Sequence, residues 1–226
     1  MYEKLRLSEL QYEKFNPDSI VFFQIADFIP KYHVNAVLDY GAGNSPYKAF
    51  ISCDQYYTAD ISQNVFKNIQ YIIHEDESLA IPDASFDLIL LLDVLEHVPR
   101  PKAVLLELKR LMRPHGSLII SVPFLYREHE TPNDYLRVTS FGAVKLLEEV
   151  GLRVYRSEKI GNVFYTILTL LLERNIENGE CVNISYKDII FNKLILMFVW
   201  LFRKSLSKKP KESAGTYHHL LLEVRL

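Results

Sequence analysis

The sequence lacks the features that mark several protein classes. Only two of its 226 residues are cysteines, Cys53 and Cys181, so we expect no disulfide framework and no oxidising compartment. The net charge of −2 disfavours a nucleic-acid binder, which needs a basic face. The first ten residues are polar and charged and lack the apolar segment of a signal peptide. These absences favour a cytoplasmic protein.

The chain also lacks an apolar run long enough to span a membrane. The longest such run, Leu194 to Phe202, has nine residues, whereas a span needs about 20. Hydrophobic residues nevertheless make up 49% of the chain, which is enough to bury a sizeable core.

Apolar runs typical of buried strands alternate with segments of helical periodicity. We expect helices within residues 1–33, from residue 101 to a stop near 113–116, and from residue 140 to Gly151. The expected strands are 34–39, 56–60, 71–73, 86–92, 117–122, 152–159 and 217–224. This alternation predicts an α/β fold. It would be a three-layer Rossmann-like sandwich with a mainly parallel seven-stranded sheet whose last strand is antiparallel.

Residues 161–211 break this alternation. They contain two apolar, helix-like stretches, 163–172 and 189–202, separated by a polar joint, and lysines follow the second. We therefore expect one domain with four parts: an N-terminal helical cap (1–33), a core (34–160), an apolar helical insertion (161–211) and the last strand (212–226).

Three roles are open for this insertion. Its helices could pack on the sheet or on a second subunit, as apolar helix faces usually do. They could form a lid over an apolar substrate. They could also dock on a membrane surface, with Trp200 and Phe202 at the interface and the lysines near anionic lipids.

An acidic residue and two glycines follow the first expected strand, as Asp39-Tyr40-Gly41-Ala42-Gly43. Glycines at such a turn let the backbone approach a ligand closely. Pro46 occupies the third glycine position of G-x-G-x-x-G, which disfavours NAD and FAD. The same Pro46, after Ser45, predicts the start of a helix. Asp60, at the end of the second expected strand, could accept hydrogen bonds from both ribose hydroxyls.

Three further segments occur in a recognisable order. They are His74 to Asp87, Asp93-Val94-Leu95-Glu96-His97-Val98, and Leu108 to Leu118 with Arg113-Pro114-His115-Gly116 inside it. With the glycine turn, they resemble the S-adenosylmethionine (SAM) methyltransferases called type 11 over about residues 34–155. The resemblance implies SAM as cofactor and S-adenosylhomocysteine as product.

The resemblance also implies a role for each matching position. Asp39 and the backbone at Gly41 and Gly43 would hold the methionine part of SAM, and Asp60 its ribose. Asp93 would lie beside the methyl group. The positions around the adenine would be Ile61, Glu75, Asp76 and Leu79.

The acceptor is expected near a long polar loop, residues 123–137, which follows the fifth strand. His129 in this loop and His97 after the fourth strand are the candidate catalytic residues, because histidine can act as a base near neutral pH. The candidate substrate-binding residues are Tyr126, Tyr135 and Arg137. The plainer alternative is a solvated loop in which Asp134 and Arg137 pair with each other.

We therefore expect a SAM-dependent methyltransferase that methylates an oxygen of a small molecule, a sugar or a lipid-linked glycan. No nucleic-acid partner and no metal site are expected. Membrane contact through residues 161–211, or a homodimer, is compatible with the apolar insertion. The rival is a non-catalytic SAM-fold protein that binds a partner through that insertion.

Overall fold

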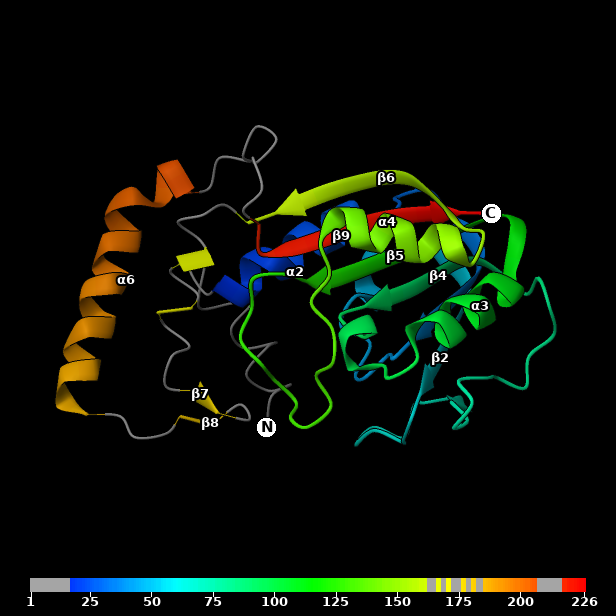
Figure 1. Cartoon of the computed structure of the whole chain (residues 1–226), viewed down its shortest axis with the longest axis horizontal. Helices are drawn as coiled ribbons and strands as arrows, with labels where there is room; N and C mark the ends of the chain where they lie inside the picture. The colour runs from blue at the N-terminus through cyan, green and yellow to red at the C-terminus, as the bar shows by residue number, and fades with distance from the viewer. Residues whose placement is uncertain are drawn as a thin grey trace.

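The computed structural model describes residues 17–161, 166–167, 170–171, 176–177, 180–181, 185–206 and 217–226 (Figure 1). The first half of the expected cap and most of the expected helix 163–172 lie outside these residues, as do three of the lysines that follow the second apolar stretch, Lys208, Lys209 and Lys211.

A seven-stranded sheet forms the centre of the fold. Its strands are β1 (Val34–Tyr40), β2 (Cys53–Asp60), β3 (Tyr71–Ile72), β4 (Phe86–Leu92), β5 (Met112–Pro123), β6 (Arg153–Ile160) and β9 (His219–Arg225). Their order is β3-β2-β1-β4-β5-β9-β6. Strand β9 is antiparallel to both of its neighbours, whereas β1 to β5 pair in parallel. The predicted sheet, with its antiparallel last strand, is confirmed.

Helices cover the two faces of this sheet (Figure 1). On one face, α3 (Pro101–Leu111) and α4 (Ser140–Glu149) pack in a core with Leu38 and Ile89. On the other, α2 (Pro17–Phe28) packs in a second core with Val37 and Leu90. Consecutive residues of one strand point to opposite faces, so each strand contributes to both cores. The three-layer arrangement follows.

The expected helix after β1 is wrong. Only a 3₁₀-helix, η1 (Lys48–Phe50), forms between β1 and β2. Ser45 has φ of +52°, whereas a helix N-cap residue needs extended backbone. The space a longer helix would fill is occupied by α2, whose Phe22 stacks on Tyr47 with ring centroids 4.8 Å apart.

Several element limits also differ from the expected ones. Strand β5 begins at Met112 rather than at residue 117, because the chain leaves α3 directly into extended backbone. The expected polar joint contains two short strands, β7 (Ile176–Glu177) and β8 (Glu180–Cys181), which pair with each other. The N-cap of α4 is confirmed, since the Thr139 hydroxyl accepts from the Gly142 N–H at 3.1 Å.

Helix α6 (Tyr186–Leu206) includes the second expected apolar helix and lies to the side of the sheet (Figure 1). None of the helices in the described part of the chain has the length and apolar character that crossing a bilayer requires.

Candidate active site

The loops after β1, β2, β4 and β5 lie at one edge of the sheet, because these strands are parallel. The glycine turn after β1 is shaped by two left-handed residues, Gly41 with φ of +72° and Gly43 with φ of +51°. A Cβ on Gly41 would lie 2.3 Å from Cγ2 of Val94, in the loop after β4. The two loops are therefore packed directly against each other, and only glycine fits at position 41.

Open space lies beside the second glycine. A Cβ on Gly43 would have no heavy atom within 4 Å, apart from its chain neighbours. The Gly43 N–H donates to Oδ2 of Asp60 at 2.8 Å, and the Ile61 N–H donates to Oδ1 at 2.7 Å. The Asp60 carboxylate is thus fixed against the glycine turn, where a ligand seated on the turn can reach it.

Asp39 lies beneath this turn and is buried. The Tyr56 hydroxyl donates to its Oδ2 at 2.7 Å. Burial raises the pKa of Asp39 to about 6, although the hydrogen bond from Tyr56 opposes the shift. The side chain is therefore ionised near pH 7 and can pair with an ammonium group.

The four positions expected around the adenine lie after β2 and β3. The Ile61 side chain is 75% exposed and available to a flat ring, whereas Leu79 is only 4% exposed and belongs to the core. Glu75 and Asp76 are exposed in the loop after β3. Asp76 accepts hydrogen bonds from the Ser78 hydroxyl and N–H, which lower the pKa of Asp76. Ile61 is therefore better placed than Leu79 to contact a ligand.

Asp93 is the first residue after β4 and has a left-handed backbone with φ of +53°. The Ser121 hydroxyl donates to its Oδ1 at 2.6 Å, and the Asp93 N–H donates to the Ser121 hydroxyl oxygen at 2.9 Å. Nε2 of His219, on β9, lies 3.6 Å from the same carboxylate oxygen. Ser121 and His219 therefore fix Asp93 at the centre of the edge.

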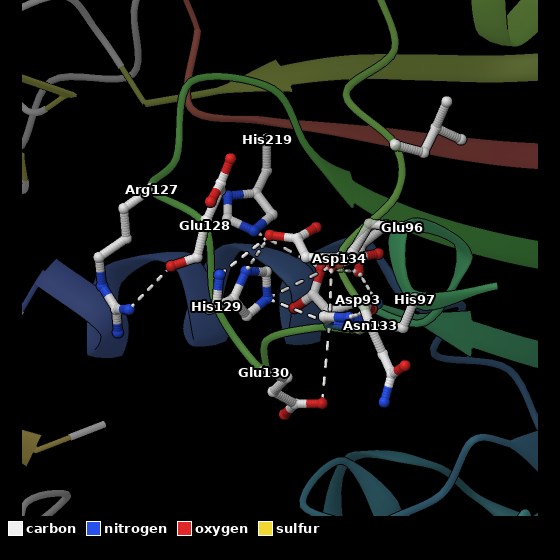
Figure 2. A network of polar contacts seen from close by, with 12 residues as sticks. Asp93, Glu96, His97, Arg127, Glu128, His129, Glu130, Asn133, Asp134 and His219 are labelled. Atoms are coloured by element: carbon white, nitrogen blue, oxygen red, sulfur yellow. Dashed lines mark hydrogen bonds and ion pairs between the residues drawn. The ribbon is translucent and has the colours of Figure 1, made fainter. Parts of the chain in front are cut away.

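The two candidate histidines face each other, with their Nε2 atoms 3.2 Å apart (Figure 2). Nδ1 of His97 lies 2.7 Å from the Asn133 carbonyl oxygen, and Nδ1 of His129 lies 3.1 Å from Oδ2 of Asp134. Both oxygens accept hydrogen bonds, so both Nδ1 atoms carry the hydrogen. Burial, together with neighbouring His97, lowers the pKa of His129. The neutral ring of His129 therefore has its lone pair on Nε2.

Arg137 holds Asp134 in place. Its two terminal nitrogens donate to the two Asp134 oxygens, each at 2.6 Å. Burial alone would raise the pKa of Asp134, but the hydrogen bonds from Arg137 and from the His129 N–H lower it. Asp134 and Arg137 therefore pair with each other, as the plainer alternative expected. Through Asp134, this pair also orients the His129 ring. Arg137 was expected to bind substrate, and its terminal nitrogens also donate to groups within the protein, so its contact with substrate stays a prediction.

The two tyrosines that were expected to bind substrate, Tyr126 and Tyr135, lie before and after His129 in the loop. The Tyr126 ring meets the His129 ring edge-on at 5.0 Å. Tyr135 is 52% exposed, and its N–H donates to the Glu96 carbonyl oxygen at 2.7 Å. This bond joins the loop after β5 to the loop after β4.

Sequence reasoning missed Glu96, although it lies within one of the motifs. Its carboxylate is completely buried, and Oε1 lies 3.8 Å from Nε2 of both His97 and His129. Neither carboxylate oxygen has a hydrogen-bond partner among the described residues. Burial raises the pKa of Glu96 well above its ordinary value. The only signal in the sequence was a carboxylate next to a histidine directly after a buried strand.

The comparisons with known proteins agree with this geometry. Residues 38–120 match a family model described as a methyltransferase domain. No curated protein matches the chain in sequence.

Several solved structures share the fold. A SAM-dependent methyltransferase from Archaeoglobus fulgidus is 15% identical, with 97% of this chain and 98% of that chain covered and a TM-score of 0.56. A possible histamine N-methyltransferase from Thermotoga maritima is 14% identical, covers 99% and 93%, and has a TM-score of 0.57. A putative methyltransferase from Haloferax volcanii, solved with its activator Trm112, is 13% identical, covers 90% and 88%, and has a TM-score of 0.56. Identities this low establish the fold alone.

The glycine turn fits SAM, because it combines an open space, a fixed carboxylate on Asp60 and an ionised Asp39 beneath it. The family match covers this turn and continues through β4 into β5. Residues 38–120 therefore match a methyltransferase-domain family model, and the chain has the fold of SAM-dependent methyltransferases of known structure.

Proposed function

We propose that the protein methylates an oxygen atom of a small molecule, a sugar or a lipid-linked glycan. SAM supplies an activated methyl group on a sulfonium when it is bound. The residues that would hold it are Asp39, at its ammonium group, and Asp60, at its ribose. The backbone at Gly43 would pass along the methionine part, since the space beside it is open.

The histidine pair is the observation that carries this proposal. A hydroxyl acceptor must lose its proton during methyl transfer, whereas a thiolate or a neutral amine need not. His129 is fixed by Asp134 with its Nδ1–H donated and its Nε2 lone pair directed toward His97. His97 is oriented in the same way by the Asn133 carbonyl. Two oriented imidazole nitrogens are suited to act on an acceptor hydroxyl.

The pair lies close to the position where the methyl group is expected. Asp93 precedes Glu96 and His97 by three and four residues, and all three follow β4 (Figure 2). The side chains of His97 and His129 are 16% and 19% exposed. Both rings are therefore partly open to solvent, while most of each side chain is shielded from water.

Transfer of labelled methyl from SAM to candidate acceptors and to lysate fractions tests the proposal. With an acceptor in hand, His129→Ala should lower turnover at least tenfold, within the range typical of acid–base groups. The affinity for SAM should change little. His115→Ala, at an exposed histidine in β5, is the control. Turnover that His129→Ala leaves unchanged would remove this residue from the reaction.

The exposed face of α6 favours a second role beside catalysis. Its exposed apolar residues recur at helical spacing and form one stripe. They are Ile190, Phe191, Leu194, Met197, Phe198 and Leu201. The stripe presents an apolar surface to solvent. It supports contact with a membrane surface or a second subunit, or the rival role of a binding protein that acts through residues 161–211.

Co-sedimentation with anionic liposomes separates these roles. Membrane docking predicts binding at low salt, weakened when Leu194 and Leu201 are changed to Ser. Without lipid binding, a dimer that the same substitutions dissociate would support the second subunit.

A further inference from the structure

We propose that Glu96, His97 and His129 bind a divalent transition-metal ion. The site rests on the proposed function, because the ion would hold the acceptor oxygen beside the methyl group. The inference departs from the sequence-based expectation of no metal. It is carried by the positions of three ligand atoms, Oε1 of Glu96 and the Nε2 atoms of the two histidines (Figure 2).

The distances among these atoms suit one ion. The two Nε2 atoms are 3.2 Å apart, and each is 3.8 Å from Oε1 of Glu96. The point equidistant from all three lies about 2.1 Å from each, which matches Zn–N and Zn–O bonds of about 2.0–2.2 Å. A single cation can therefore lie within bonding distance of all three.

The hydrogen bonds around the histidines are those of metal ligands. A ligating histidine donates its other ring N–H to a carboxylate or a backbone carbonyl. Here His97 donates to the Asn133 carbonyl and His129 to Asp134. These bonds leave two lone pairs facing each other at 3.2 Å, an arrangement that repels unless a proton or a cation lies between the nitrogens.

The buried glutamate is a second, independent observation. A carboxylate that is completely buried and accepts no hydrogen bond is costly. Both oxygens of Glu96 are buried and accept no hydrogen bond from a described residue. Oε1 faces the two imidazoles. Asp93 and Asp134 add negative charge nearby. Arg137 offsets part of this charge but is engaged with Asp134, so a cation at the two imidazoles would compensate the Glu96 carboxylate directly.

Two imidazoles and one carboxylate leave further coordination positions open. Glu130 is one neighbour on the open side, since its Oε2 lies 3.8 Å from Nε2 of His97 and its side chain is 75% exposed. An acceptor hydroxyl bound at an open position would have a lowered pKa. In the metal-bound state, His97 and His129 would be ligands that act on the acceptor through the ion rather than as bases.

Titration of chelator-treated protein with Mn²⁺, Zn²⁺ and Co²⁺, followed by calorimetry and by Co²⁺ absorption, tests the site without SAM or an acceptor. We expect one ion per chain. Glu96→Gln and His129→Ala should each weaken binding at least 100-fold, and Asp134→Asn, which removes an orienting group, about 10- to 100-fold. His33→Ala, at an exposed histidine that contacts Asp54 at 3.0 Å, is the matched control and should bind as the wild type does.

Thermal unfolding, measured with and without metal, distinguishes a variant that has lost the metal site from one that folds poorly. Glu96→Gln keeps a side chain of nearly the same shape and cannot carry a charge, so the metal-free variant should be at least as stable as the wild type while losing the metal-induced rise in Tm. If no ion binds, or if Glu96→Gln binds as tightly as His33→Ala, the inference is wrong and a proton lies between the imidazoles. Methyl transfer that persists in excess chelator overturns the ion's role alone. Metal binding without methyl transfer overturns the proposed function alone.

Discussion

Replacement of Gly41 by alanine tests how tightly the cofactor turn is built. The new Cβ would lie 2.3 Å from Cγ2 and 2.9 Å from Cγ1 of Val94. Valine has a stiff, branched side chain that cannot swing aside easily. The φ of +72° adds a conformational penalty that glycine avoids.

The expected loss of stability follows from these two contributions. The left-handed backbone costs a residue with a Cβ roughly 1–2 kcal/mol, and overpacking costs roughly 1–3 kcal/mol. Gly41→Ala should therefore lower the free energy of unfolding by about 2–5 kcal/mol. A chain of this size loses roughly 2–4 °C in Tm for each kcal/mol.

Gly43→Ala is the matched control, because it has a similar φ of +51° but no atom within 4 Å of the new Cβ. It should lose only the roughly 1–2 kcal/mol of the backbone penalty. Its Cβ would instead enter the open space beside the turn. We therefore expect Gly43→Ala to weaken SAM binding at least tenfold while it loses less stability than Gly41→Ala.

A double-mutant cycle measured by urea unfolding isolates the clash. Val94→Ala removes both methyl groups that Gly41→Ala would meet, so the double variant should be more stable than the sum of the two single effects by about 1–3 kcal/mol. Equal destabilisation by Gly41→Ala and Gly43→Ala, or strictly additive effects in the cycle, would refute this explanation of the turn.

Three further predictions address other parts of the molecule. Burial raises the pKa of Asp39 to about 6, so the carboxylate expected to pair with the SAM ammonium is lost as pH falls. The affinity for SAM, measured by calorimetry, should fall by up to tenfold per unit below pH 6 and stay weak at every pH in Asp39→Asn. An affinity that is flat down to pH 5 would contradict this role. Asp60→Asn keeps one acceptor oxygen but loses the charge and one of the bonds from Gly43 and Ile61, so it should weaken SAM binding at least tenfold and also lower Tm. A wild-type affinity would place the ribose elsewhere. Thr139→Ala removes the N-cap of α4 and should cost about 1 kcal/mol in urea unfolding. No loss would mean that water replaces the cap.

The central strands of the sheet, β1, β4 and β5, could be predicted from the sequence because they are buried on both faces. Strand β4 is almost continuously apolar, and its predicted limits are those in the structure. The acidic and glycine residues after β1 and β2 could be placed at one edge of the sheet for the same reason, since parallel strands bring their carboxyl ends together.

The helix after β1 could not be predicted correctly from local signals. Ser45 and Pro46 are suited to start a helix, but α2 already covers that part of the sheet, and Phe22 packs on Tyr47 there. Tertiary packing of α2 on this segment therefore outweighs its local helix propensity.

The histidine cluster could be predicted only in part, because tertiary contacts bring its residues together. His97 and His129 could be selected by residue type and by their places after strands. Their approach depends on a loop that folds back across the sheet edge, fixed by the bond from the Tyr135 N–H to the Glu96 carbonyl. Glu96 belongs to the cluster because of that long-range contact. Nothing in its local sequence separates it from an ordinary surface acid.

Calorimetric titration of the wild-type protein with SAM and with S-adenosylhomocysteine tests the central claim most directly. The site described around Asp39, Gly43 and Asp60 predicts one molecule of either ligand per chain, with Gly43→Ala and Asp60→Asn each binding at least tenfold more weakly. Absence of binding by both ligands to the folded wild-type protein would contradict the assignment of this turn as a SAM site.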